Sequence, residues 1–333
     1  MKFIRRAITT ALMLGLAAGA SAVLAQAAPG SDATYPSRPI RLIVPYSPGG
    51  TTDKLARIVA NELKGKLGGN AAVIVENKPG AGTIIGTETV TKAAPDGYTL
   101  LLGVNTSISS NPLLFKKLPY SVDQLRPVAL LSMAPMILSV TPNNPANTIA
   151  DLIATSKTKK GGLSVATLGN GSSVHLVAEL VALKTGMQIT PVPYNGSGPA
   201  LLAVMSGDVD LYGDSIPTSI PLINSGRIKP VAISSGERSP LYPDLPTFEE
   251  AGVKGGTVYT WFGVMAPSKT PDAIVAKLNK AINEILEAPA IRGQLEADGN
   301  TVRQMSPKGF QEFIDSETKV WAGVIKATHI QLD

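Results

Sequence analysis

Short apolar runs alternate along the chain with stretches in which apolar residues recur every three or four positions. The first apolar run, at residues 42–44, is followed by apolar residues at helical spacing up to Leu67. The same order recurs at residues 72–93 and several times between residues 163 and 234. A short apolar run indicates a buried strand, and the helical spacing indicates an amphipathic helix. The alternation therefore predicts an α/β fold with parallel-rich sheets and flanking helices.

Two longer extended runs, at residues 128–140 and 259–265, interrupt this alternation. Each could carry the chain from one group of elements to another. Amphipathic helices are predicted after the second run, at residues 271–287 and 307–327. We therefore expect two lobes joined by two crossing strands that act as a hinge. The expected division is residues 28–131 plus 262–333 for a discontinuous lobe 1 and residues 132–261 for lobe 2.

The first strand runs into a loop rich in proline, glycine and hydroxyl residues, within the segment RLIVPYSPGGTTDKLA at 41–56. Gly49 and Gly50 let the backbone approach a ligand closely, and Thr51 or Thr52 is expected to cap the helix that follows. The unpaired N–H groups in the first turn of a helix attract anions. We interpret the segment as an anion-binding loop; a tight strand-to-helix connection without a ligand is the alternative.

Two later loops repeat this arrangement. The sequence LGNGSS at 168–173 follows a predicted strand and precedes a predicted helix, with Ser172 or Ser173 as the expected N-cap. A third loop of the same kind, PYNGSG, occupies residues 193–198. Asp214 follows another predicted strand, where it either enters the space between the lobes or caps the next helix.

The sequence offers little to a catalytic mechanism or a cofactor. It contains no cysteine and two histidines, and it lacks the GxSxG, HExxH and DxDxDG motifs. His175 lies in the first turn of a predicted helix, where it could reach an anion or only pack locally. An exported serine hydrolase that uses Ser172 or Ser173 with His175 stays open as an alternative. The GxGxxxG pattern at 80–86 misses the dinucleotide-binding motif by one residue, so no cofactor and no metal are expected.

The first 27 residues have the features of a secretory signal peptide: a basic start, an apolar stretch and a small-residue AQA site. We expect cleavage after Ala27 and, because there is no cysteine for a lipid anchor, a soluble exported protein. The segment carries Lys2, Arg5 and Arg6, which account for most of the formal net charge of +5. No dense basic run follows them, so nucleic acid is not an expected partner.

Seven segments stand out in order along nearly the whole mature chain: YPSRPIRLIVPYSPGGTTDKLAR, VENKPGAGTIIG, PDGYTLLL, NPLLFKKLPY, PVPYNGSGPALLAVMSGDVDLY, YPDLPTFEEAG and WFGVMAPSKTP. Together they resemble the substrate-binding proteins of tripartite tricarboxylate transporters, the Bug family. The resemblance implies a periplasmic protein with the two-lobed type II binding-protein fold and no enzymatic activity. Its cleft would hold a small dicarboxylate, tricarboxylate or aromatic acid for delivery to membrane permease subunits. A subunit that senses the ligand for a membrane kinase is a further alternative, and we expect a monomer.

The resemblance also implies which residues hold the solute. In the first loop these are Tyr46, Ser47, Gly49, Gly50, Thr51 and Asp53; in the second-lobe loop they are Gly169, Asn170, Gly171, Ser172 and His175; elsewhere they are Ser107, Tyr194, Gly196, Ser197 and Asp214. The stretch DSIPT, from Asp214 to Thr218, departs from the pattern common in the family. The specificity of that wall of the cleft therefore stays open.

Overall fold

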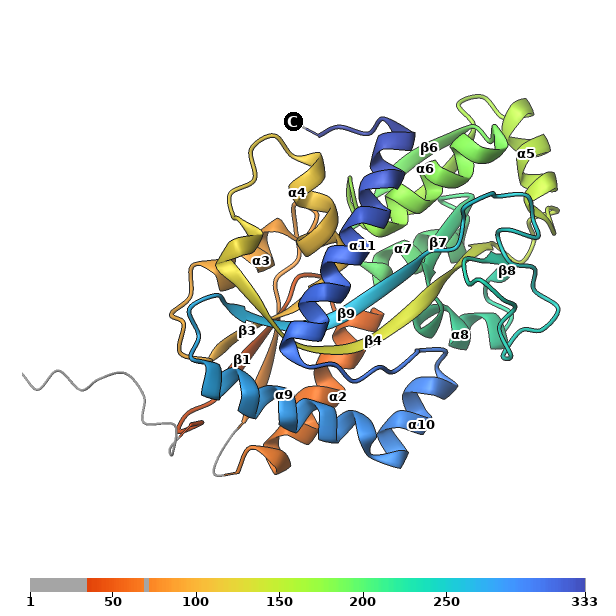
Figure 1. The fold of residues 1–333 in the computed structure, drawn as a ribbon. Coiled ribbons are helices and arrows are strands. Elements are labelled where there is room, and N and C mark those ends of the chain that lie inside the picture. The colour runs from red at the N-terminus through yellow and green to blue at the C-terminus, as the bar shows by residue number, and fades with distance from the viewer. Residues whose placement is uncertain (1–34, 69–71, 333) are drawn as a thin grey trace, which may run out of the picture. The chain divides into compact units, whose positions relative to one another are not determined.

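A computed structural model describes residues 35–68 and 72–332, and these residues form nine strands that join in one mixed sheet (Figure 1). The predicted signal peptide lies outside the described residues. The strands are β1 (Ile40–Val44), β2 (Val73–Asn77), β3 (Thr99–Val104), β4 (Leu125–Val140), β5 (Leu163–Thr167), β6 (Ile189–Pro193), β7 (Leu211–Ser215), β8 (Lys229–Ile233) and β9 (Tyr259–Pro267). Their order across the sheet is β2-β1-β3-β9-β4-β7-β5-β6, and β8 pairs with β4.

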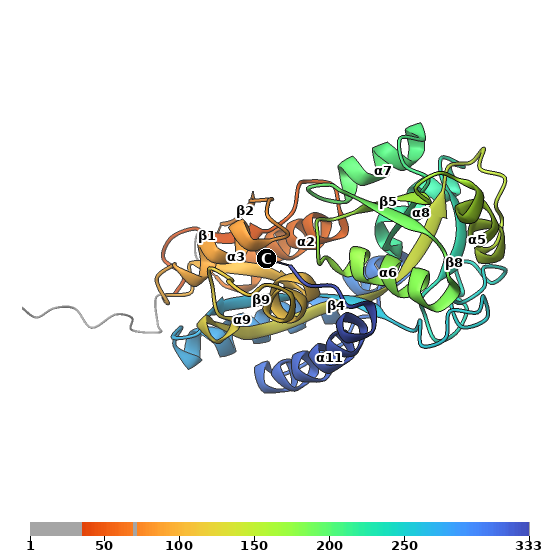
Figure 2. The ribbon, with the colours of Figure 1, turned by 90° about the horizontal axis from the view of Figure 1, so that it is seen from above.

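Helices flank this sheet and follow most of its strands (Figures 1 and 2). They are α2 (Thr51–Lys66), α3 (Ile84–Thr91), α4 (Asn111–Leu114), α5 (Ile149–Thr158), α6 (Ser173–Thr185), α7 (Ser197–Ser206), α8 (Ile216–Asn224), α9 (Asp272–Glu287), α10 (Pro289–Ala297) and α11 (Pro307–Thr328). A π-helical turn at Thr106–Ser110 precedes α4. The α/β alternation expected from the apolar pattern is therefore confirmed.

Parallel pairing brings the carboxyl ends of neighbouring strands together in each half of the sheet. β1 pairs in parallel with β2 and β3, and β5 pairs in parallel with β6 and β7. The helices α2, α6, α7 and α8 directly follow β1, β5, β6 and β7. Ligands of parallel α/β sheets bind beyond the carboxyl ends of the strands. The topology thus places four helix N-termini where a ligand site is expected.

β4 and β9 connect the two halves of the sheet. The first part of β4 pairs antiparallel with β9, from Leu125 opposite Pro267 to Pro135 opposite Tyr259. From Met136 onward β4 pairs with β7 and β8 instead. The two crossing strands expected from the sequence are confirmed. The lobe boundaries expected from the sequence fall within this pair and remain a prediction.

An aromatic cluster and the helix α11 stabilise this connection. Trp261 of β9 is fully buried, and its ring meets that of Phe310 of α11 edge to face, with the ring centroids 5.5 Å apart. α11 contacts β4 and α6, and α9 also packs on β4 (Figure 1). The C-terminal helices therefore cover the crossing strands rather than forming a separate layer.

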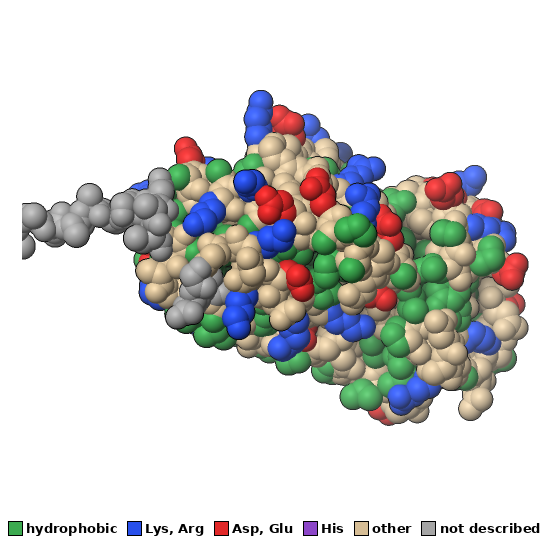
Figure 3. Space-filling view, turned by 90° about the horizontal axis from the view of Figure 1, so that it is seen from below, with side chains coloured by type: hydrophobic (Ala, Val, Ile, Leu, Met, Phe, Trp, Pro, Cys, Tyr) green, Lys and Arg blue, Asp and Glu red, His purple; other side chains and the backbone are tan. Residues whose placement is uncertain are grey.

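The surface carries both signs of charge. Basic and acidic side chains are interspersed over the face shown in Figure 3. Some of them form ion pairs, such as Arg238 with Glu250 at 2.9 Å. Within the described part of the chain, no helix combines the length and the apolar character needed to cross a membrane.

Candidate functional site

A small buried cavity of about 20 Å³ lies where four helices begin. Its lining includes residues from the start of each helix: Thr51 and Thr52 of α2, Ser173 and Val174 of α6, Ser197 of α7, and Ser215 directly before α8. The first turn of a helix presents N–H groups that have no partner within the helix, and it carries a partial positive charge. A volume of this size holds about one or two water-sized groups, comparable to the two oxygens of a carboxylate. The cavity is therefore suited to a small anionic group.

The loop before α2 turns sharply at Gly49, whose φ of +95° favours glycine. Gly50 is the N-cap of α2, and Thr51 is the first residue of the helix. The predicted threonine cap is wrong, because the extended backbone of Gly50 takes the cap position. The Thr51 hydroxyl instead hydrogen-bonds the hydroxyls of Ser215, at 2.7 Å, and Thr218.

Asp53 holds this loop from within α2. Its two carboxylate oxygens accept hydrogen bonds from Arg57 Nε and Nη2 and from Asn77 Nδ2, each at 3.0 Å, and from the Gly49 N–H at 3.1 Å. Burial alone would raise the pKa of Asp53, but these hydrogen bonds outweigh it and hold the pKa below its ordinary value. Asn77 also donates to the carbonyl oxygen of Tyr46, at 3.0 Å. Asp53 therefore positions the loop, and both of its oxygens are used within the protein.

Ser172 and His175 fix the second loop in a similar way. Ser172 is the N-cap of α6, as expected for one of the two candidates, and its Oγ accepts from the N–H groups of His175 at 3.2 Å and Leu168 at 3.3 Å. His175 Nδ1 accepts from the Gly171 N–H at 3.0 Å, and its Nε2 lies 3.4 Å from Glu179 Oε1. These contacts do not pair the imidazole ring with a serine hydroxyl, which a serine hydrolase would require.

Loops from the two halves of the sheet meet directly around the cavity. The Ser47 N–H donates to the Asn195 carbonyl at 3.1 Å, and the Thr51 N–H donates to Thr218 Oγ1 at 3.1 Å. Gly196, with a φ of +151°, packs so closely on Ser47 that an added Cβ would lie 3.1 Å from the Ser47 nitrogen. Glycine is therefore required at this contact, and the loops after β1 and β6 touch at the level of the backbone.

Asp214 lies within β7, and it lines the cavity. The alternative that it caps α8 is wrong, because Ser215 is the N-cap. Asp214 Oδ1 accepts from the Ser215 N–H at 2.7 Å, whereas Oδ2 is buried without a hydrogen-bond partner. Burial raises the pKa of Asp214 to about 6. Among the residues that the structure describes, no group of three or more His, Cys, Asp or Glu side chains could hold a metal ion.

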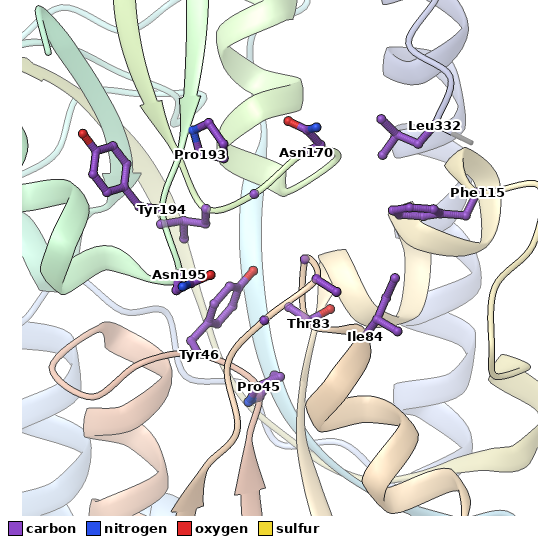
Figure 4. Close-up of a pocket in the computed structure, with 15 residues that line it drawn as sticks. Pro45, Tyr46, Thr83, Ile84, Phe115, Asn170, Pro193, Tyr194, Asn195 and Leu332 are labelled. Carbon is purple, nitrogen blue, oxygen red and sulfur yellow. The ribbon is translucent and has the colours of Figure 1, made fainter.

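A larger pocket of about 460 Å³, here named the outer pocket, opens beside the cavity (Figure 4). Tyr46 and Leu168 line both spaces, so they form the boundary between them. In Figure 4, Phe115, Leu332 and Ile84 gather at the end of the outer pocket that lies away from Tyr46. The other lining residues are Pro45, residues 80–83, 169–170 and 193–195.

The solute-binding residues expected from the sequence fall into three groups. Tyr46, Thr51, Ser197 and Asp214 line the cavity, and Tyr46, Gly169, Asn170 and Tyr194 line the outer pocket. Ser47, Gly50 and Gly196 form contacts between the loops. Gly49, Asp53, Ser107, Gly171, Ser172 and His175 line neither space and instead shape the surrounding turns. Direct contact of each of these residues with a solute remains a prediction.

Sequence reasoning missed several of the lining residues. Thr52 and Ser173 sit in first helical turns beside expected residues, so the helix periodicity could have found them. Phe115 and Leu332 carry no local signal. Their positions depend on the packing of the C-terminal segment, where the Leu332 N–H donates to the Leu114 carbonyl at 3.0 Å.

The chain matches a known family over most of its length. The family model described as the tripartite tricarboxylate transporter family receptor, TctC, covers residues 55–330. The chain belongs to this family. Protein BugT of Bordetella pertussis is a TctC relative that is 40% identical over 312 residues, which cover 92% of this chain and 94% of BugT. Because TctC proteins are transporter receptors and not enzymes, the hydrolase alternative is wrong.

Solved structures agree with this TctC assignment. The periplasmic binding protein BugD shares 34% identity and a TM-score of 0.84, over 89% of this chain and 99% of BugD. MatC from Rhodopseudomonas palustris, solved with bound malate, shares 34% identity and a TM-score of 0.83, over 87% of this chain and 100% of MatC. The periplasmic binding-protein fold expected from the sequence is thereby confirmed.

Proposed function

We propose that this TctC-family receptor binds a small carboxylate-bearing solute between the two halves of its sheet and delivers it to membrane permease subunits. The carboxylate occupies the cavity at the N-termini of α2, α6, α7 and α8. The rest of the solute extends into the outer pocket. Two lobes, residues 28–131 plus 262–333 and residues 132–261, close around it by bending at β4 and β9.

The observation that carries this proposal is the convergence of four helix N-termini on one buried cavity. The described residues that line the cavity include no Lys, Arg or His. A charge-assisted hydrogen bond contributes roughly 1.5 to 3 kcal/mol, so a few N–H groups and hydroxyls suffice to hold a carboxylate without a guanidinium. Thr52 and Ser173 also line the cavity, and their hydroxyls can serve as further donors.

Helix N-termini accept several kinds of anion, such as phosphate, sulfate and carboxylate. The relatives favour a carboxylate among these. MatC was solved with malate, and it matches this chain over nearly its whole length. The proposed setting is the periplasm, since BugD is a periplasmic binding protein and residues 1–27 have the pattern of a signal peptide. We propose that the mature protein acts there as a monomer.

A thermal-shift screen of the mature protein tests the proposed function. A ligand that binds only the folded state stabilises it by mass action and so raises the melting temperature. At a ligand concentration one hundred times its Kd, the free energy of unfolding rises by about 2.7 kcal/mol. Carboxylic acids such as malate, adipate, hexanoate and phenylacetate form the test set, and the matching neutral amides form the control set. We expect at least one acid to stabilise the protein in a concentration-dependent way and its amide to have no effect. Failure of every acid at millimolar concentration, or equal stabilisation by the amides, would contradict the proposal.

A further inference from the structure

We propose that Asp214 binds the solute as a neutral carboxylic acid, so that one proton is shared between Asp214 Oδ2 and the carboxylate of the solute. This binding mode rests on the proposed function, in which that carboxylate occupies the cavity. Capture of an ionised solute by the ionised form of Asp214 is then coupled to the uptake of one proton from water.

Asp214 presents one unused carboxylate oxygen at the cavity. It lines the cavity and is 3% exposed. Its Oδ1 accepts from the Ser215 N–H at 2.7 Å, whereas Oδ2 is buried and has no hydrogen-bond partner among the described residues. A buried polar atom without a partner is rare in folded proteins and calls for an explanation. A solute in the cavity would supply the missing partner.

The cavity is too small to keep two carboxylate ions apart. Its volume is about 20 Å³, so a solute carboxylate inside it would lie against Asp214. Two carboxylates that share a site repel each other, and the pKa of one of them is strongly raised as a result. A proton between them replaces this repulsion with a charge-assisted O–H···O⁻ hydrogen bond. The pair then carries a single negative charge.

The elements packed on β7 bring no cation to Asp214. The described residues that line the cavity include no Lys, Arg or His, and β5, α7 and α8 contain no charged residue. Asp214 pairs with the second half of β4, whereas Arg126 lies at the start of that strand and bonds Asp272 at 2.7 Å. The titratable residues of α6 are His175 and Glu179, which lie 3.4 Å apart, and Lys184 in its last turn.

The first turn of α2, which faces β7 across the cavity, does not neutralise Asp214 either. Both carboxylate oxygens of Asp53 are used within the loop before α2. Lys54 is exposed, and its Nζ donates to the Pro217 carbonyl at 3.4 Å. A proton is therefore the simplest means of removing the repulsion between Asp214 and a bound carboxylate.

Tyr46 and Tyr212 are the other titratable groups that face Asp214. Burial raises the pKa of both tyrosines, so they stay neutral near pH 7. Burial also raises the pKa of Asp214 to about 6, although polar groups of Ser197, Ser215 and Tyr212 around it favour the ionised form. The protonated form of Asp214 is thus accessible near neutral pH before any solute arrives.

The hydrogen-bond donors at the cavity serve one anion better than two. The N–H groups of Thr51 and Ser173 already donate to threonine hydroxyls, at 3.1 Å and 3.3 Å. Pro199 and Pro217, in the first turns of α7 and α8, have no N–H to offer. A shared proton removes the need for a second set of donors.

Calorimetric titration at pH 6, 7 and 8 tests this binding mode. The probes are those of malate, adipate, hexanoate and phenylacetate that stabilise the protein in the thermal-shift screen. The apparent Kd rises as the binding-competent fraction of the protein falls. With a pKa of about 6, that fraction falls from about one half at pH 6 to about 1% at pH 8. We expect the affinity of the wild-type protein to be roughly 50-fold weaker at pH 8 than at pH 6.

Asp214→Asn should abolish this pH dependence. The amide keeps the size of the side chain, and its N–H groups donate at every pH. We expect equal affinities at pH 6 and pH 8, and tighter binding than the wild type at pH 8. Asp208→Asn is the matched control, because Asp208 is exposed just after α7 and does not line the cavity. It should keep the pH dependence of the wild type.

A pH-stat titration in weakly buffered solution counts the protons directly. We expect the wild-type protein at pH 7.5 to take up about one proton for each solute bound, and Asp214→Asn to take up none. The affinity series and the proton count of the wild-type protein decide the question even where Asp214→Asn is poorly folded.

The possible outcomes are distinct. Weaker binding at pH 8 in the wild type and Asp208→Asn, but not in Asp214→Asn, supports the shared proton. Equal wild-type affinities at pH 6 and pH 8 without proton uptake overturn it and leave the proposed function standing. Loss of binding in a folded Asp214→Asn, or an unchanged pH dependence in that variant, also overturns it. Binding of no acid at any of the three pH values overturns both.

Discussion

Asp214 is a buried carboxylic acid on the wall of the cavity. It is 3% exposed, its Oδ2 has no hydrogen-bond partner, and burial raises its pKa to about 6. Burial also raises the pKa of Tyr46 and Tyr212 above the ordinary value, so both neighbours stay neutral below pH 9. The charge at the cavity wall is therefore set by Asp214.

Replacement of Asp214 should change how stability depends on pH. The pKa of Asp214 is raised in the folded state, so between about pH 4 and pH 6 the folded protein keeps a proton that the unfolded chain releases. The stability that this group contributes is therefore fully present below about pH 4 and is lost as the pH rises through about 6. The free energy of unfolding falls by about 3 kcal/mol in total over this range. We expect Asp214→Asn to be more stable than the wild type at pH 7.5 and to show no such advantage at pH 4. Urea unfolding at both pH values measures this; the same difference between the two proteins at both pH values would contradict it.

The helix caps show how far single residues could be predicted. Ser172 could be named as a cap candidate, because a serine before an apolar helical pattern accepts from the first-turn N–H groups. The sequence predicts Thr51 or Thr52 in the same role, but Gly50 caps α2 and the Thr51 hydroxyl bonds Thr218 instead. That partner is 167 residues away along the chain. The local sequence therefore indicates that hydroxyl residues begin these helices, but it does not indicate which distant residue each hydroxyl bonds.

At the level of elements, the contact between α2 and α8 joins the two halves of the sheet. The Thr51 N–H donates to Thr218 Oγ1 at 3.1 Å, and Lys54 Nζ donates to the Pro217 carbonyl at 3.4 Å. The first turn of α2 is thus shared between the cavity and the neighbouring helix.

Removal of the Thr218 hydroxyl should weaken solute binding. Thr218→Val keeps the shape of the side chain and deletes the acceptor of the Thr51 N–H, so the contact between α2 and α8 is weaker when the lobes are closed. We expect the affinity for the acid found in the thermal-shift screen to fall about tenfold, ~1.4 kcal/mol, the size of one buried hydrogen bond. Thr158→Val, at the exposed end of α5, is the control. Equal calorimetric affinities for the two variants would show that the contact does not matter for binding.

Elements with a strong pattern could be predicted closely. β5 begins at Leu163, where the second alternating series is predicted to begin, and the long apolar run at 128–140 corresponds to β4, which is buried along most of its length. α10 was not expected, because Leu295 is its one buried residue and its sequence therefore lacks an apolar stripe. The pairing of distant strands, such as β4 with β9, could not be predicted from local sequence. The unusual length of the two extended runs was the one local sign of it.

At the scale of the whole molecule, β4 and β9 are the elements on which closure would depend. The β4–β9 register shifts between Pro127 and Ala129 and again between Leu130 and Ser132. Such irregularities bend a strand locally. The lobe boundaries expected from the sequence, at Ser132 and Trp261, lie in this pair of strands, where Met133 is opposite Trp261.

Closure about this hinge should be visible in solution. Two lobes that close around a solute become more compact, as in other hinge-bending binding proteins. We expect small-angle scattering to give a smaller radius of gyration for the mature protein with a saturating acid than without it. A radius that does not change at saturation would exclude a closing motion of this kind.

The central claim is that helix N-termini hold the carboxylate, and a calorimetric titration of Gly50→Asp tests it most directly. Gly50 has a φ of −83°, so aspartate fits its backbone, and the new Cβ would lie 3.3 Å from Ser197 Cβ, at the contact of α2 with α7. Gly171→Asp is less suitable, because φ is +76° and a Cβ would meet Leu114 Cδ1 at 2.5 Å.

Gly65→Asp is the matched control, since Gly65 is exposed in the last turn of α2 with no neighbour in reach. We expect Gly50→Asp to lose at least about two orders of magnitude in affinity for the acid found in the screen, with little change in its melting temperature without ligand. Gly65→Asp should bind as the wild type does. A folded Gly50→Asp protein with wild-type affinity would contradict the account, because the carboxylate would then lie elsewhere.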